Sequence, residues 1–223
     1  MEKAGKNGKL EYSGKNFGFW KIRSKGFYYV DKTGLIAELL RAKAEVTLIT
    51  RPRRFGKTLG MSMLESFFDI RKDSRKLFEG LEIETNPLLC REWMNQWPVI
   101  FLSLKNVDGL CFSDAYQQLV YEISCLYQEH AYLLKSPDLS ELDKATFKRI
   151  LERRAEKTEV SRSIQLLSQL MNRHYQKKVI LLVDEYDVPV AKANSNGYYK
   201  EMLDVMKSLM QSLKVFLRAQ VIW

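Results

Sequence analysis

The chain has 223 residues, of which 46% are hydrophobic and 12% aromatic, with only 11 Gly and 5 Pro. This composition can bury a full core, which excludes the disordered, collagen-like and disulfide-stapled classes of protein. The net charge of +9 comes from residues 1–60, which carry 14 Lys and Arg against 5 Asp and Glu, so any function must give this segment a role.

The first predicted elements are a basic arm, a short strand and a helix. Residues 1–26 are rich in Lys, Gly, Asn and Ser, a composition typical of a loosely packed arm. The aromatic run at 27–30 predicts a short strand. Asp31 can then cap a helix predicted over 33–43, whose apolar residues fall on one face.

The rest of the chain alternates apolar runs with amphipathic segments. Strands are predicted over 46–50, 99–104, 179–183 and 215–222. Helices are predicted over 57–70, 113–135, 139–156, 161–175 and 198–212, and a turn over 194–197. The run at 179–183 is aliphatic at every position, as expected of a parallel strand covered on both faces. Buried strands that alternate with helices predict an α/β fold, with a mostly parallel sheet and flanking helices.

The segment between the strand at 46–50 and the helix at 57–70 has the pattern of a phosphate-binding loop, in the strand-to-helix context that such a P-loop requires. Backbone N–H groups at the helix N-terminus would meet an anion, Lys57 would reach the β- and γ-phosphates of ATP, and Thr58 would ligate Mg²⁺. The standard template has Gly where this chain has Arg51. The residues predicted to bind ATP are Arg53, Arg54, Phe55, Gly56, Lys57 and Thr58.

The strand at 179–183 ends in Asp184 and Glu185, which is the Walker B arrangement. Ligands of open parallel sheets bind at this carboxyl edge. Asp184 would hold Mg²⁺ together with Thr58, and Glu185 is the predicted catalytic group that polarises the attacking water. The alternative is a buried strand that simply runs into an acidic, exposed turn. Two motifs in the right order and context favour the nucleotide site.

Three blocks of sequence together resemble one family. They read Tyr-Val-Asp-Lys-Thr at 29–33, Arg-Pro-Arg-Arg-Phe-Gly-Lys-Thr at 51–58 and Asp-Glu-Tyr-Asp-Val-Pro at 184–189. The blocks are similar to those of the predicted AAA-ATPase-like family, bacterial P-loop proteins in which a PD-(D/E)XK nuclease-like domain often follows. The resemblance spans residues 17 to 210 and implies that the chain binds ATP with Mg²⁺. It also implies that Arg51 is a usual residue of the loop.

The last ten residues depart from what P-loop ATPases with this acidic pair would show. Such proteins place a further strand between the loop strand and the Walker B strand, and that strand usually ends in a polar sensor residue. Residues 214–223 identify neither a sensor nor an arginine finger. We therefore expect an AAA-like domain over 27–223 that is truncated at its C-terminal end. The strand at 46–50 would then lie near an exposed edge, covered by a partner or by residues 27–30.

Two alternatives to an ATPase remain open from the sequence. One is a nucleic-acid-binding module, in which the basic arm pairs phosphates with the rings of Phe17, Phe19 and Trp20. The other is an interaction domain that binds nucleotide without turnover. The expected partners are thus ATP, nucleic acid through the arm, and a protein partner or second copy of the chain.

Several common sites and locations are not indicated. The sequence shows neither a secretory signal nor an apolar run long enough to span a membrane. Its three cysteines lack zinc-ligand spacing, and His130 and His174 are expected at the surface or at its boundary, without an assigned partner. We therefore expect a cytoplasmic protein with no membrane contact.

Overall fold

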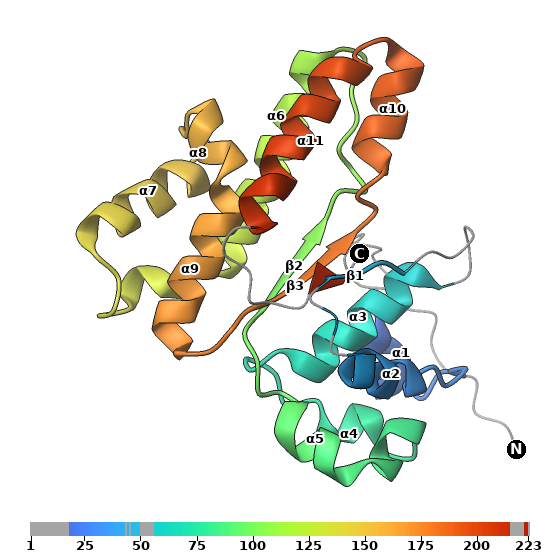
Figure 1. Cartoon of the computed structure of the whole chain (residues 1–223). Coiled ribbons are helices and arrows are strands. Elements are labelled where there is room, and N and C mark those ends of the chain that lie inside the picture. Colours follow the sequence, from blue (N-terminus) through green and yellow to red (C-terminus); the bar gives the residue numbers. More distant parts are fainter. Residues whose placement is uncertain (1–17, 43, 45, 50–55, 215–220, 223) are drawn as a thin grey trace, which may run out of the picture.

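The computed structural model describes residues 18–42, 44, 46–49, 56–214 and 221–222. Most of the predicted arm, and Arg51, Arg53, Arg54 and Phe55 of the predicted loop, lie outside these residues. The described part is a mixed helix and strand fold built on a small parallel sheet (Figure 1). Its strands are β1 (Val46–Thr47), β2 (Val99–Ser103), β3 (Ile180–Asp184) and β4 (Val221–Ile222).

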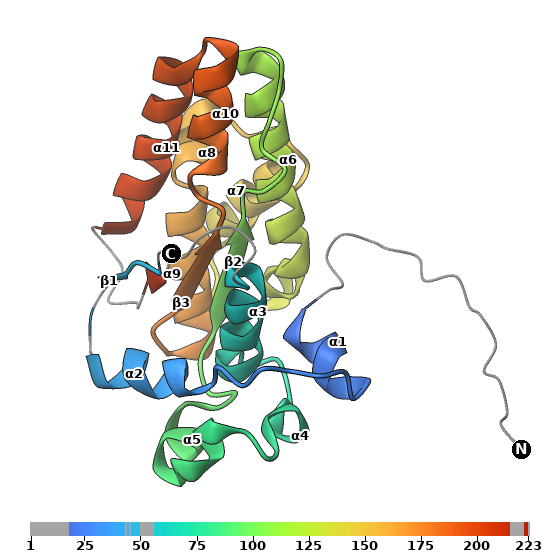
Figure 2. The same cartoon turned by 90° about the vertical axis from the view of Figure 1, so that its right-hand side faces the viewer.

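Helices pack on both faces of this sheet (Figures 1 and 2). On one side lie α1 (Phe19–Ser24), α2 (Gly34–Ala42), α3 (Lys57–Phe68), α4 (Arg75–Phe78), the 3₁₀ helix η1 (Glu82–Thr85) and α5 (Pro87–Trp93). The other group comprises α6 (Phe112–Glu129), the 3₁₀ helix η2 (Ala131–Lys135), α7 (Glu141–Leu151), α8 (Lys157–Ser161), α9 (Ser163–Tyr175), α10 (Val188–Asn196) and α11 (Tyr199–Lys214).

The two faces of β3 explain this layering. Successive side chains of a strand point to opposite faces of the sheet. Ile180 and Leu182 accordingly pack in the core around α3, whereas Leu181 and Val183 pack in the core around α6 and α9. β3 is buried along its whole length, which confirms the prediction of a strand covered on both faces.

The sheet order corrects the prediction about its missing strand. The strands lie in the order β1-β4-β3-β2, with all pairs parallel. β4 therefore occupies the place between the loop strand and β3 that we expected to be empty. β1 does lie at the edge of the described sheet, as expected, and Leu48 just after it is 53% exposed.

Three local expectations differ from the structure. Residues 27–30 form no strand, because only Tyr29 packs inward and Tyr28 is 91% exposed. Part of the segment expected to be a loose arm is helix α1, whose Phe19 is buried against Tyr29 and Phe78. The turn expected at 194–197 is the end of α10, closed by Gly197 with a φ of 83° in the left-handed region that favours glycine.

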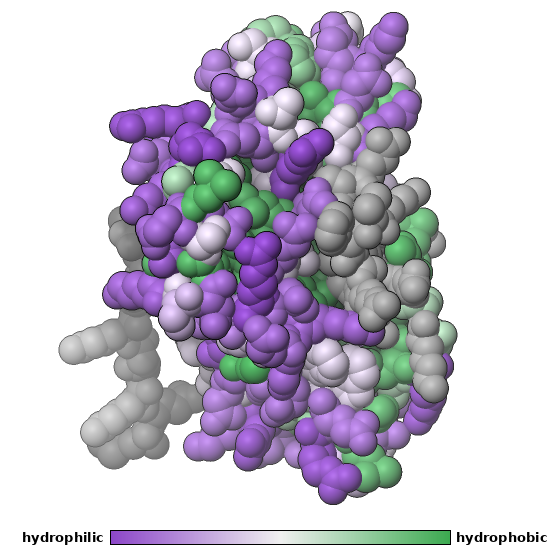
Figure 3. Space-filling model, turned by 60° about the vertical axis from the view of Figure 1, so that its left-hand side comes forward, coloured by the Kyte–Doolittle hydropathy of each residue, from purple (hydrophilic) through white to green (hydrophobic). Residues whose placement is uncertain are grey.

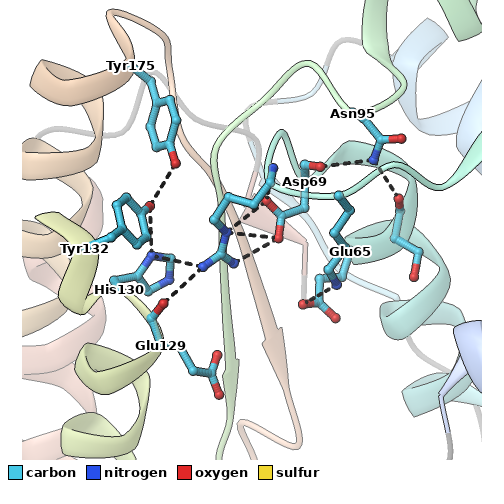
Figure 4. A network of polar contacts seen from close by, with 10 residues as sticks. Glu65, Asp69, Asn95, Glu129, His130, Tyr132 and Tyr175 are labelled. Carbon is cyan, nitrogen blue, oxygen red and sulfur yellow. Dashed lines mark hydrogen bonds and ion pairs between the residues drawn. The ribbon is translucent and has the colours of Figure 1, made fainter.

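A polar network joins the two helical groups beside β2 (Figure 4). Arg71 pairs with the buried Asp69, which follows α3, and its guanidinium also reaches the C-terminal end of α6 at the Glu129 carbonyl oxygen and His130. His130 is fully buried, so the expectation that it lies at the surface or at its boundary is wrong. Its position next to an element end gives no periodic sequence signal that would reveal burial.

The face formed by α7, α8 and α9 is mostly hydrophilic, with separate hydrophobic areas (Figure 3). Salt bridges such as Arg149–Glu159 and Arg173–Asp143 lie on these helices. Such a surface is typical of a solvated helix face. The chemically distinctive groups lie instead where α3 meets β3.

Candidate functional site

Gly56 and the first turn of α3 form one side of the candidate site. Gly56 is the residue before the helix, with a φ of 78° in the left-handed region, and Lys57 and Thr58 open the first turn. No side chain of the described residues caps this end, and the first turn carries no acidic residue. The first N–H groups of a helix have no partner within it, and they carry a partial positive charge. This end of α3 is therefore suited to an anion.

Asp184, at the carboxyl end of β3, forms the other side. It is 3% exposed, and it accepts a hydrogen bond from the Thr58 side chain. Its Oδ2 has no hydrogen-bond partner among the described residues. Burial raises the pKa of Asp184 above its ordinary value and Glu185 adds to this, while Thr58 and Lys57 act in the opposite direction. An unpartnered carboxylate oxygen in such a position can accept a cation.

Glu185 follows Asp184 in a strained backbone conformation. Its φ is 57°, in the left-handed region that non-glycine residues seldom adopt. Its carbonyl oxygen accepts a hydrogen bond from the Val188 N–H at 3.1 Å, which starts the turn into α10. Strain of this kind persists where the surroundings fix it, and it clusters at functional sites. Glu185 is half-buried and lies directly after the buried Asp184.

One pocket brings these elements together. The side chains of Lys57, Asp184 and Glu185 line it with residues from α2, from α3 and from the segment after β1. The described residues that line it are Lys32, Leu35, Ile49, Gly56, Lys57, Gly60, Met61, Met63, Val183, Asp184, Glu185 and Tyr186. Thr58 reaches it through its hydrogen bond to Asp184. The three remaining predicted residues, Arg53, Arg54 and Phe55, lie outside the described residues.

Among the described lining residues, Lys32 is the charged residue to which the sequence motifs assigned no role. It precedes α2, and its ammonium lies 3.6 Å from the place where a Cβ on Gly56 would stand. The signal that could have identified it is the Tyr-Val-Asp-Lys-Thr block, which carried the family resemblance but no chemical assignment.

The described residues contain neither a ready-made cluster of metal ligands nor a membrane-spanning helix. No group of three or more His, Cys, Asp and Glu side chains in them is placed to hold a metal ion. Within the same residues, no helix has the length and apolar character needed to cross a membrane.

Comparison with known proteins gives one family and one relative. A family model described as a predicted AAA-ATPase matches residues 16–222. An uncharacterized protein in the vnfD 5′ region of Azotobacter chroococcum mcd 1 is 30% identical over 173 residues, which are 77% of this chain. The same residues are 28% of that protein, so this chain spans little more than a quarter of its relative. No solved structure matches.

Proposed function

The chain belongs to the predicted AAA-ATPase family, and from that premise we propose that it binds ATP with Mg²⁺ in the pocket between α3 and β3 and hydrolyses it. The observation that carries the proposal is the environment of Asp184. This buried carboxylate has one unpartnered oxygen and lies beside Thr58 and Lys57, at a helix end that offers free N–H groups.

In this proposal the start of α3 binds the phosphates. The N–H groups of the first helical turn donate to phosphate oxygens, and the helix dipole adds to the attraction. Lys57 places its ammonium on the β- and γ-phosphates, and Gly56 allows the main chain to approach. Arg53, Arg54 and Phe55 belong to the same proposed binding loop.

Thr58 and Asp184 would hold Mg²⁺. Both offer oxygen atoms, which Mg²⁺ prefers, and two protein ligands suffice because this ion takes its other ligands from phosphate and water. The Oδ2 atom of Asp184, which has no hydrogen-bond partner among the described residues, could bind such an ion. Bound there, Mg²⁺ would neutralise negative charge on the phosphates.

Glu185 would orient the attacking water. A carboxylate next to the Walker B Asp can accept a hydrogen bond from water, and phosphoryl transfer depends mainly on such positioning and on electrostatics. Glu185 lines the pocket, and its strained backbone supports this role, because such strain clusters at functional sites.

Two variants test the proposal. Lys57→Ala should weaken ATP binding by about 100-fold, because it removes a charge-assisted phosphate contact. Glu185→Gln should retain ATP binding and lose about 100-fold or more in turnover. Calorimetry with ATP and Mg²⁺ measures the first effect, and phosphate release measures the second.

The two readouts separate the parts of the proposal. Unchanged ATP affinity in Lys57→Ala would overturn the assignment of the phosphate site. If the wild-type protein binds ATP·Mg²⁺ but releases no phosphate, the domain binds nucleotide without turnover, and the hydrolytic half of the proposal is wrong.

A further inference from the structure

We propose that Lys32 is a second phosphate-binding cation of this pocket, supplied from outside the loop that precedes α3. The inference rests on the proposed function, since it takes the ligand of the pocket to be the triphosphate of ATP. Lys32 lines the same pocket as Lys57. Its Nζ lies 3.6 Å from the Cβ position of Gly56, directly beside the main chain that begins the phosphate-binding turn.

The charge of the pocket supports this assignment. The described lining holds two carboxylates, Asp184 and Glu185, and two ammonium groups, Lys32 and Lys57. Among the described lining residues, Lys32 is one of the two cations that balance the two carboxylates. Like charges repel strongly where water is partly excluded. Lys32 therefore supplies half of the positive charge that these residues offer to an anionic ligand.

The backbone on both sides of Lys32 is held in place by hydrogen bonds to side chains. Asp31 accepts from the N–H of Thr33 at 2.8 Å and from its hydroxyl at 2.7 Å, and its second oxygen accepts from the Glu82 N–H at 2.6 Å. The Thr33 hydroxyl oxygen in turn accepts from the Ile83 N–H at 3.1 Å. This clamp ties the segment before α2 to η1, and Thr33 is fully buried within it.

The preceding residues add a further anchor. The Lys32 N–H donates to the hydroxyl of Tyr29, and that hydroxyl also contacts the sulfur of Met63 on α3 at 3.2 Å. The Tyr29 ring packs edge-on against buried Phe19 with centroids 5.2 Å apart. Because the backbone at Lys32 is already held in place, a ligand contact through this residue requires no further ordering of the main chain, which is one way that preorganised sites gain affinity.

The experiment compares four variants with the wild-type protein: Lys32→Ala, Lys32→Arg, Lys25→Ala and Lys57→Ala. Lys25 is the matched control, because it is an exposed lysine of the same N-terminal region that does not line the pocket. Calorimetry measures the affinity for ATP·Mg²⁺ and for inorganic tripolyphosphate. Thermal melting without ligand checks that each variant is folded.

We expect Lys32→Ala to lose about 10- to 100-fold in affinity for both ligands, as for the loss of a charged hydrogen bond. Lys32→Arg should keep most of the affinity because it keeps the charge. Lys25→Ala should bind as the wild type does.

Two results would count against the inference in different ways. If Lys32→Ala binds ATP with wild-type affinity while Lys57→Ala has lost it, Lys32 makes no phosphate contact and the nucleotide site stands without it. If the wild-type protein binds neither ATP nor tripolyphosphate, the proposed function itself fails, and the inference fails with it.

Discussion

Asp69 and Asp184 are both buried aspartates, 0% and 3% exposed, but their surroundings differ. Asp69 accepts hydrogen bonds from the Arg71 guanidinium at 2.8 and 3.0 Å and from the Arg71 N–H at 2.9 Å. Asp184 has the Thr58 hydroxyl on one side and an unpartnered Oδ2 on the other. A buried charge is costly unless it is paired. The first aspartate is hydrogen-bonded to its counter-ion within the fold, whereas the second feels the charge of Lys57 and keeps one oxygen that a ligand cation can meet.

The partners of Asp69 extend into the second helical group. Arg71 Nη1 donates to the Glu129 carbonyl oxygen at 3.3 Å and lies 3.4 Å from His130 Nδ1. The Tyr132 hydroxyl lies 3.3 Å from the same ring nitrogen, and Tyr175 donates to Tyr132 at 3.0 Å (Figure 4). The region around Asp69 thus fixes one half of the molecule against the other. The difference teaches that burial alone does not mark a functional carboxylate; an incomplete set of partners does.

Asp69→Asn should have the largest effect on folding stability. It removes the counter-ion of Arg71, whose side chain is only 27% exposed, and leaves that guanidinium without a negatively charged group to replace Asp69. We expect a loss of about 3 kcal/mol in the free energy of unfolding, as for breaking a buried ion pair from one side. Urea denaturation measures it, and nucleotide binding should survive in the folded fraction.

Asp73→Asn is the matched control, because Asp73 is an exposed aspartate close to Asp69 in sequence. Its effect should stay within about 0.5 kcal/mol, as is usual for surface substitutions. Equal stabilities of the two variants would show that the Asp69–Arg71 pair does not stabilise the fold. Asp69 could then no longer be contrasted with Asp184 as a structural carboxylate.

The two regions also differ in how far the sequence could predict them. The meeting of Lys57 with Asp184 follows from local patterns, since an apolar strand followed by Asp-Glu and a Gly-Lys-Thr helix start both end at the carboxyl edge of a parallel sheet. The burial of β3 on both faces was predictable for the same reason. These features depend on short-range periodicity and on one rule of sheet topology.

The rest depends on contacts between distant segments. Arg71 and His130 are 59 residues apart, and no pattern in either segment predicts their contact. Lys32 reaches the pocket only because Asp31 and Thr33 bind η1, some 50 residues away. The place of β4 between β1 and β3 is likewise a matter of long-range pairing, which two residues of strand cannot specify on their own.

A second prediction concerns the pH dependence of the region around Asp69. Burial lowers the pKa of His130 to about 3, and the nearby Arg71 charge adds to this. The unfolded chain binds a proton on this residue near pH 6.5, whereas the folded chain does not, so stability falls as the pH drops below 6.5. At about 1.4 kcal/mol per pH unit, His130 should account for a loss of about 2 kcal/mol between pH 6.5 and 5.

The measurement is urea denaturation at several pH values for the wild type, His130→Gln and His174→Gln. His130→Gln should flatten the decline below pH 6.5, whatever its effect on absolute stability. His174 is only partly buried and bonds to the Ser136 hydroxyl, so His174→Gln controls for the removal of a histidine. Identical slopes in the wild type and His130→Gln would show that His130 is protonated in the folded protein.

Asp184→Asn should have a smaller effect on stability than Asp69→Asn, and in the opposite direction. Because burial raises the pKa of Asp184, its protonated form favours folding, and this contribution is lost as the pH rises through the pKa of the folded state. At neutral pH the ligand-free protein carries a buried, under-partnered charge that Asn would remove. We expect a gain of about 1 kcal/mol in the free energy of unfolding, typical of relieving a conflict at a functional site, together with loss of the stabilisation by ATP·Mg²⁺.

Thermal melting with and without ATP·Mg²⁺ measures both effects of Asp184→Asn, and the gain in stability should shrink as the pH is lowered. If Asp184→Asn instead destabilises the ligand-free protein as Asp69→Asn does, then Asp184 is a structural carboxylate and the contrast between the two regions does not hold.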